Sequence, residues 1–253
     1  MSQIGCFITG GWTEAGAMNL FLKKINNNFD YIQCLPNKPK YKKGLDAKSS
    51  GLTGEALINE MYRRMELYKD EYSKFSAIII EDDLDCRFHG KSEEDIIKYK
   101  DNIQKKISLI LEKEMPVFFL FASPEIEVWF LCDWNNSFVK VYNDQYFCHR
   151  LKIYIDKFVV KEYWEKGIEN YSGKKISEEI IDAVANGVKN EIQKEYINKN
   201  IPIHICKIID DRALYYSKKI HGDMMLKNIN PEKLLVKCNV FFSQSYHSLN
   251  SFN

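Results

Sequence analysis

Two short apolar runs constrain the fold of this chain more than any other feature of its sequence. Residues 77–80 read AIII, and residues 116–123 read PVFFLFAS, without alternation of polar and apolar side chains. Strands of this kind are buried on both faces, as in parallel sheets that are covered by helices. The chain is therefore expected to contain a mainly parallel α/β sheet.

The first 135 residues alternate between short strands and amphipathic helices. Besides the two apolar runs, strands are expected at residues 4–9 and 31–35. Helices are expected from Thr13, around residues 57–68, after a capping box at Ser92 and Asp95, and from Ser123-Pro124. This alternation of strands and helices along the chain predicts a doubly wound domain over residues 1–135.

Residues 136–253 have a different character. A mixed stretch at 138–158 is followed by an expected helix near residues 178–196 and by a tail from Asp210 that looks helical, with a break at Pro231. We expect this part to be a mainly helical extension that packs back on the sheet.

The composition narrows the range of functions. Lys and Arg number 36 and Asp and Glu 35, so the formal charge of +1 gives no global attraction to nucleic acid or to a membrane. The seven cysteines form an odd set without a Cys-x-x-Cys pair, which argues against a disulfide scaffold and a structural zinc site. No window is long and apolar enough to span a bilayer, and a cytoplasmic protein is expected.

Acidic side chains follow three of the expected strands. Glu14 comes after the first, Asp83 and Asp85 follow AIII, and Glu125 and Glu127 follow PVFFLFAS. The carboxyl ends of parallel strands share one edge of a sheet, where ligands usually bind. Carboxylates that gather there repel one another unless a cation intervenes, and oxygen ligands suit Mg²⁺ or Mn²⁺. The structural alternative is that these acids are solvated turn residues or favour a helix N-terminus, as Glu125 would after Ser123-Pro124.

Three segments resemble Toprim-related proteins. The segment IIIEDDLD resembles the strand and Asp-x-Asp motif of Toprim domains, with Asp83 and Asp85 in the aspartate positions. GGWTEAGAM resembles the Glu-Gly-x-Thr-Glu motif of RloB-like and allied families, and SPEIEVWFLCDW is similar to a later motif in which Glu127 and Trp129 fall on the family positions.

The ends of the chain add to this resemblance and also depart from it. The tail is similar to a lysine-rich helix, a glycine and a late Cys-x-x-Phe pattern of these families, at Lys218, Lys219, Gly222, Cys238 and Phe241. The first Glu of the Glu-Gly-x-Thr-Glu motif, however, is Gly10 here. Only the second acid, Glu14, is present.

The resemblance to Toprim-type and OLD-type nucleases implies a metal-dependent nuclease of bacterial anti-phage defence. Asp83, Asp85 and Glu127, assisted by Glu14, would bind Mg²⁺ or Mn²⁺, and Lys219 or Lys218 would neutralise charge on the phosphate. DNA or tRNA would be the substrate. Its backbone would contact a basic loop, which could equally be a solvated lysine run. The lysines of that loop are Lys40, Lys42, Lys43 and Lys48.

Two other interpretations stay open. The absence of an acid at Gly10 is also compatible with a catalytically weakened binding or regulatory subunit, which would partner an ATPase of the same defence system or form a homodimer. Phosphotransfer of the haloacid-dehalogenase type also uses Asp-x-Asp. It fits poorly, because its motif belongs on the first strand and Arg87 replaces the expected Thr or Val.

Overall fold

The structure is a computed structural model of the chain. It describes residues 1–9, 12–36, 51–85, 87–88, 90–158 and 218–253, and the single positions Glu169, Asn186, Asn190, Lys199 and Tyr216. Several predicted features lie outside these residues, namely Gly10, the helix near 178–196 except at Asn186 and Asn190, and the loop lysines Lys40, Lys42, Lys43 and Lys48.

The described strands form one parallel sheet of four. These strands are β1 (Ser2–Ile8), β2 (Phe29–Leu35), β3 (Ala77–Asp83) and β4 (Val117–Ala122). They lie in the order β2-β1-β3-β4, and each neighbouring pair is parallel. The expected α/β class with a parallel sheet is confirmed.

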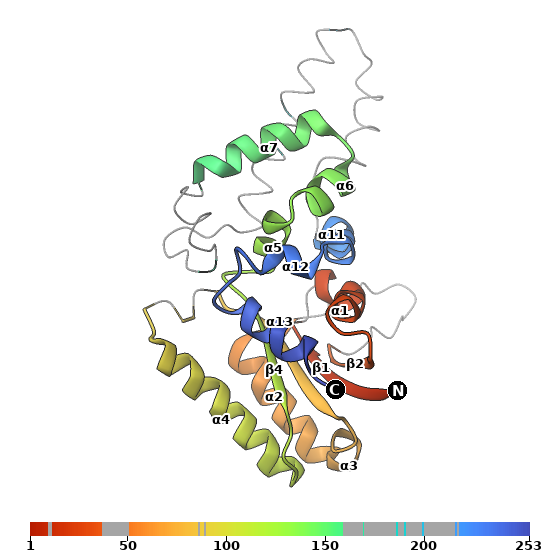
Figure 1. Cartoon of the computed structure of the whole chain (residues 1–253), viewed down its shortest axis with the longest axis vertical. Helices are drawn as coiled ribbons and strands as arrows, with labels where there is room; N and C mark the ends of the chain where they lie inside the picture. Colours follow the sequence, from red (N-terminus) through yellow and green to blue (C-terminus); the bar gives the residue numbers. More distant parts are fainter. Residues whose placement is uncertain are drawn as a thin grey trace.

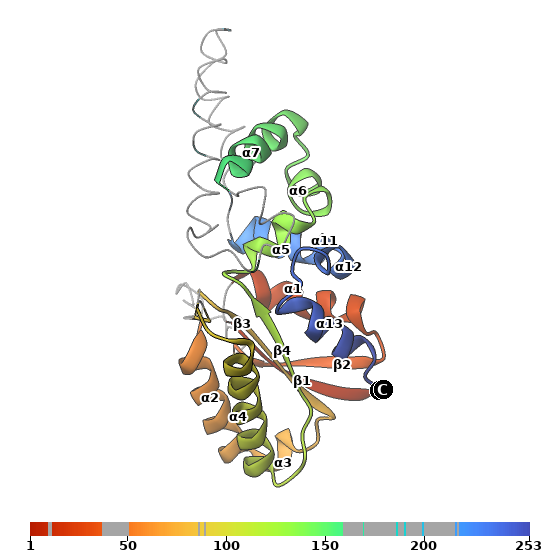
Figure 2. The same cartoon turned by 60° about the vertical axis from the view of Figure 1, so that its left-hand side comes forward.

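Helices cover both faces of this sheet, as Figures 1 and 2 show. On one face lie α2 (Gly54–Leu67), α3 (Lys69–Tyr72) and α4 (Glu93–Leu111). On the other lie α1 (Trp12–Ile25) and α13 (Phe242–Asn250). Helices α11 (Asp223–Asn228) and α12 (Pro231–Leu234) pack against α1. Ile79 of β3 packs in the core on the α1 side, whereas Ile78 and Ile80 pack in the core under α2 and α4. Burial on both sides explains the uninterrupted apolar runs.

Strand β3 continues beyond its predicted end at Ile80. Glu81, Asp82 and Asp83 pair with Leu120, Phe121 and Ala122 of β4, so the acidic residues belong to the ladder itself. The prediction that Asp83 follows the strand was wrong, because backbone pairing with the apolar β4 extends the strand through it.

The helix after β4 also begins later than predicted. It is α5 (Glu127–Cys132) and does not start at Ser123-Pro124. The backbone N–H of Ile126 donates instead to Asp83 Oδ1 at 2.9 Å, and the carbonyl of Pro124 accepts the N–H of Asp85 at 3.0 Å. Residues 124–126 are thus tied to the turn after β3.

The capping box predicted for α4 is confirmed. Ser92 Oγ accepts the backbone N–H of Asp95 at 3.2 Å, and Asp95 Oδ2 accepts the N–H of Ser92 at 3.1 Å. The predicted break at Pro231 is confirmed as well, since α12 starts there behind the N-cap residue Asn230.

The rest of the described chain consists of helices and the turns that join them. It contains η1 (Asn135–Val139), α6 (Lys140–Tyr142), α7 (Gln145–Phe158) and the π-helical turn η3 (Lys218–Gly222). Phe138 and Leu226 share the α1-side core with Ile79, and Ser245 of α13 donates to the carbonyl of Phe119 in β4. The division into residues 1–135 and 136–253 stays a prediction. Among the described residues, no helix has the length and apolar composition that crossing a membrane would require.

Candidate functional site

The acidic end of β3 sends its side chains to both faces of the sheet. Successive side chains of a strand point to opposite faces, so Glu81 and Asp83 share the α1 side with Ile79, and Asp82 lies on the α2 side with Ile80. The two faces therefore carry different acidic residues, and each has its own partners.

On the α1 side, Glu81 and Asp83 meet carboxylates from two helices. Glu14 lies in the first turn of α1, and Glu127 is the first residue of α5. We call Glu14, Glu81, Asp83 and Glu127 the carboxylate cluster. Their exposed fractions are 2%, 0%, 8% and 0%, respectively. The cluster thus joins residues from the carboxyl ends of β1, β3 and β4 at one edge of the sheet.

The charges of these residues act on one another strongly. Burial, and then the negative charges of Glu14 and Asp83, raise the pKa of the Glu81 carboxyl well above its usual range. Burial, and then Glu14 and Glu127, do the same to the pKa of Asp83. Mutual repulsion between buried carboxylates favours their neutral forms. A bound proton or another cation would therefore relieve the repulsion at Glu81 and Asp83.

The oxygens of Glu81 have unequal surroundings. Oε2 accepts the backbone N–H of Thr9, at the end of β1, at 3.0 Å. Oε1 is buried and has no hydrogen-bond partner among the described residues. A buried oxygen without a partner is costly, and it marks a place where a proton or a cation would be stabilised.

A positive charge from the C-terminal part of the chain lies beside the cluster. Lys218 Nζ lies 3.6 Å from Glu127 Oε1, and its charge lowers the pKa of Asp83 against the larger opposing effects. The hydroxyl of Tyr216, which is buried, donates to the same Glu127 oxygen at 2.8 Å. Thr13 Oγ1 donates to the carbonyl of Lys218 at 3.2 Å, so α1 holds this segment in place.

Asp82, on the opposite face, forms a structural junction. Its carboxylate accepts the N–H of Gly54 at the start of α2, at 3.0 and 3.1 Å, and is paired with Arg87 at 2.9 Å. Gly54 has φ of +57°, and a Cβ there would lie 2.7 Å from the Arg87 guanidinium. The carboxylate therefore links α2, β3 and the turn after β3.

The structure brings some of the predicted site residues together and leaves others out. Asp83, Glu127 and Glu14 come together as expected. Asp85 is exposed, has φ of 46° and lies in the turn after β3, and it is not among the charges that shift the pKa of Asp83. Lys219 belongs to η3, but its side chain lies outside the described part, as do Lys40, Lys42, Lys43 and Lys48.

Sequence reasoning missed Glu81 and Tyr216. The apolar run predicts a strand that ends at Ile80 and so leaves Glu81 outside it. Once the strand is extended, the spacing of two residues places Glu81 and Asp83 on one face. Tyr216 lies 89 residues from Glu127 in the sequence, and no local pattern connects them.

The residues of the cluster fit a divalent cation in their chemistry. Carboxylate oxygens are the ligands that Mg²⁺ and Mn²⁺ prefer, and the buried Oε1 of Glu81 is an oxygen without a hydrogen-bond partner in the described part. Within the described residues, however, no three His, Cys, Asp or Glu side chains are already arranged around one point that could hold a metal ion. Binding would therefore require side chains of the cluster to reorient.

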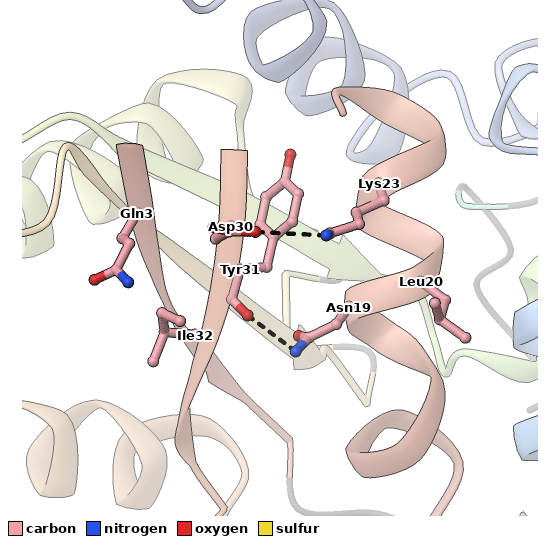
Figure 3. Close-up of a pocket in the computed structure, with 7 residues that line it drawn as sticks. All are labelled: Gln3, Asn19, Leu20, Lys23, Asp30, Tyr31 and Ile32. Atoms are coloured by element: carbon pink, nitrogen blue, oxygen red, sulfur yellow. Dashed lines mark hydrogen bonds and ion pairs between the residues drawn. The ribbon is translucent and has the colours of Figure 1, made fainter. Parts of the chain in front are cut away.

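A surface depression lies elsewhere, between α1 and the edge strand β2 (Figure 3). Lys23 and Asp30 form an ion pair across it at 3.5 Å, and Asn19 donates to the carbonyl of Tyr31 at 3.0 Å. It includes no residue of the carboxylate cluster. The Oδ1 atom of Asn19 is buried there without a hydrogen-bond partner among the described residues. We place the candidate site at the cluster, where acidic side chains from several elements converge.

Comparison of the chain with protein-family models, with curated proteins and with solved structures found no match.

Proposed function

We propose that this protein is a cytoplasmic nuclease that uses Mg²⁺ or Mn²⁺ to hydrolyse phosphodiester bonds of DNA or RNA, as an effector of anti-phage defence. One observation carries the chemical part: Glu14, Glu81, Asp83 and Glu127 gather at the carboxyl end of the sheet, beside Lys218. A divalent ion bound there supplies polarisation of the phosphate and a water molecule of lowered pKa. The biological role rests on the resemblance to Toprim-related families.

The residues of the chain have separate tasks in this proposal. Glu81 and Asp83 would hold the cation, whose positive charge would offset the repulsion that raises the pKa of both carboxyls. Glu127 is oriented by the Tyr216 hydroxyl. Lys218, whose side chain is 29% exposed and lies beside Glu127, would stabilise negative charge that develops on the phosphate.

A second function has one observation in its favour. No carboxylate of the cluster is more than 8% exposed, which limits the access of a phosphodiester. On this alternative, the chain is a binding or regulatory subunit that partners an ATPase, and the cluster is a structural cation site. Both proposals include a cation bound at the cluster. They differ in whether the protein catalyses cleavage.

Cleavage assays separate the two. Purified protein is incubated with plasmid, single-stranded DNA and tRNA, in Mg²⁺, in Mn²⁺ and in a chelator. The matched variants are Asp83→Asn and Asp85→Asn, which make the same chemical change two residues apart, one inside the cluster and one exposed.

A nuclease of the proposed kind cleaves at least one substrate only with the metal, and Asp83→Asn lowers the rate by about 100-fold or more. Asp85→Asn keeps the rate within a few-fold. Metal-dependent cleavage that is equal in wild type and Asp83→Asn contradicts the proposal. Metal binding without cleavage of any substrate supports the regulatory alternative.

A further inference from the structure

A pair of cysteines lies outside the carboxylate cluster and takes no part in the proposed hydrolysis. Cys132 is the last residue of α5, and Cys238 lies in the turns between α12 and α13. Their Sγ atoms are 3.4 Å apart, although 106 residues separate them in the sequence. Both are free thiols in the structure.

The geometry requires little change to join the two sulfurs. A disulfide has an S–S distance of about 2.05 Å, so each sulfur would move by roughly 0.7 Å, which a small side-chain rotation supplies. The backbone on both sides is held by its own hydrogen bonds. Cys238 N–H donates to the carbonyl of Leu234 at 2.7 Å, and the carbonyl of Cys238 accepts from Ser243 at 3.0 Å.

The two thiols differ in their access to solvent. Cys238 has no exposed surface, whereas Cys132 is partly exposed. Burial is the largest of the influences that raise the pKa of the Cys238 thiol. An oxidant from solvent therefore reaches Cys132 first, and Cys238 lies in place to react second.

We propose that Cys132 and Cys238 are a thiol oxidation site that reacts with hydroperoxides and closes to a reversible disulfide. Cys132 sulfur attacks one peroxide oxygen, the O–O bond breaks, and a sulfenic acid and water form. Cys238 sulfur then attacks the Cys132 sulfur; the S–S bond forms, the S–O bond breaks, and the hydroxyl leaves as water with the Cys238 proton. Two thiols and one hydrogen peroxide thus give one disulfide and two waters.

The disulfide would connect two parts of the chain that matter for the site. Helix α5 begins with Glu127 of the carboxylate cluster, and Cys238 precedes α13, which packs on β4. Closure of this long loop restricts the unfolded chain. The oxidised protein is therefore expected to unfold at a higher temperature than the reduced protein, whatever reaction the cluster catalyses.

The test uses the full chain, first reduced and then freed of reductant. It is treated with hydrogen peroxide, and all seven cysteines are mapped by mass spectrometry without reduction. The expected product has lost two hydrogen atoms, contains a peptide pair joined through Cys132 and Cys238, and returns to the thiol form with dithiothreitol. Pairing of other cysteines, or oxidation of Cys132 to sulfinic acid without any link to Cys238, would overturn the proposal.

Two variants and a control sharpen the result. In Cys238→Ser, the sulfenic acid at Cys132 should persist and be trapped by a dimedone reagent, and in Cys132→Ser the Cys238 thiol should resist peroxide. Cys34→Ser, which removes a partly buried thiol of β2, should leave the disulfide yield unchanged. An equal yield of trapped Cys132 in wild type and Cys238→Ser would contradict the role of Cys238. The disulfide map of the wild-type protein tests the proposal even if a variant folds poorly.

Discussion

At the scale of single residues, Glu81 and Asp82 show how adjacent acids in one strand acquire different roles. Asp82 receives two backbone hydrogen-bond contacts from Gly54 and an ion pair from Arg87. Glu81 receives the N–H of Thr9 and is otherwise surrounded by negative charge. Asp82 is stabilised by the fold, whereas Glu81 gains stability from a proton or a cation.

The role of Asp82 leads to a prediction on stability. Asp82→Ala should lower the free energy of unfolding by about 2–4 kcal/mol, because it leaves the Gly54 N–H and the Arg87 guanidinium without their buried acceptor. Urea unfolding followed by circular dichroism measures the change. Glu60→Ala, which breaks the more exposed ion pairs with Arg63 and Arg64, is the control and should cost about 1 kcal/mol or less. Equal losses for the two variants would contradict a structural junction at Asp82.

At the scale of elements, the N-terminal end of α13 depends on a residue far away in sequence. The carboxylate of Glu169 accepts the N–H groups of Val240, Phe241 and Phe242 at 2.7, 2.8 and 3.1 Å. Its carbonyl accepts the hydroxyl of Ser123, directly after β4, at 3.2 Å. Glu169 thus satisfies backbone donors at a helix start and links α13 to the end of β4.

This link predicts a pH dependence of stability. Burial raises the pKa of Glu169 to about 7, although the three N–H groups oppose it. This folded-state pKa lies above the unfolded value. The stabilisation that Glu169 contributes to the folded protein is therefore complete below about pH 4.5 and is lost as the pH rises through about 7. The free energy of unfolding should fall by about 3 kcal/mol over this window on account of Glu169.

The measurement compares wild type with Glu169→Gln by urea unfolding between pH 4.5 and pH 8. The amide of the variant does not titrate. Over this pH range, the free energy of unfolding should therefore fall by about 3 kcal/mol less in Glu169→Gln than in wild type. Glu81 and Asp83 also have raised pKa values and contribute a fall that both proteins share. Identical pH profiles in the two proteins would show that Glu169 titrates in the same way in the folded and unfolded chain.

Much of the element structure could be predicted from local sequence patterns. The capping box at Ser92 and the break at Pro231 are short-range signals, and the structure has both. The end of β3 could not be predicted, because it depends on pairing with β4, about 40 residues later. The start of α5 depends in the same way on the contact between Ile126 and Asp83.

At the scale of the whole molecule, the parallel sheet is what assembles the candidate site. At one edge of the sheet lie Glu81 and Asp83 of β3, together with Glu14 of α1 and Glu127 of α5, the helices that follow β1 and β4. They meet there because the strands run in the same direction. This convergence followed from the sequence, since apolar runs predicted the sheet and the acids came after them. The site also includes Glu81 and Tyr216, and it leaves Asp85 exposed. These features follow from strand register and from contacts between distant segments. No single stretch of sequence encodes these.

The most direct test of the central claim is a titration of metal-free protein with Mn²⁺, in which free Mn²⁺ is measured by electron paramagnetic resonance. Wild type and Asp85→Asn should bind the ion with similar affinity, and Glu81→Gln should bind it about 10-fold more weakly or worse, because the variant loses a carboxylate of the cluster. Loss of binding in Asp85→Asn with full binding in Glu81→Gln would contradict a site at the carboxylate cluster, as would a wild type that does not bind Mn²⁺.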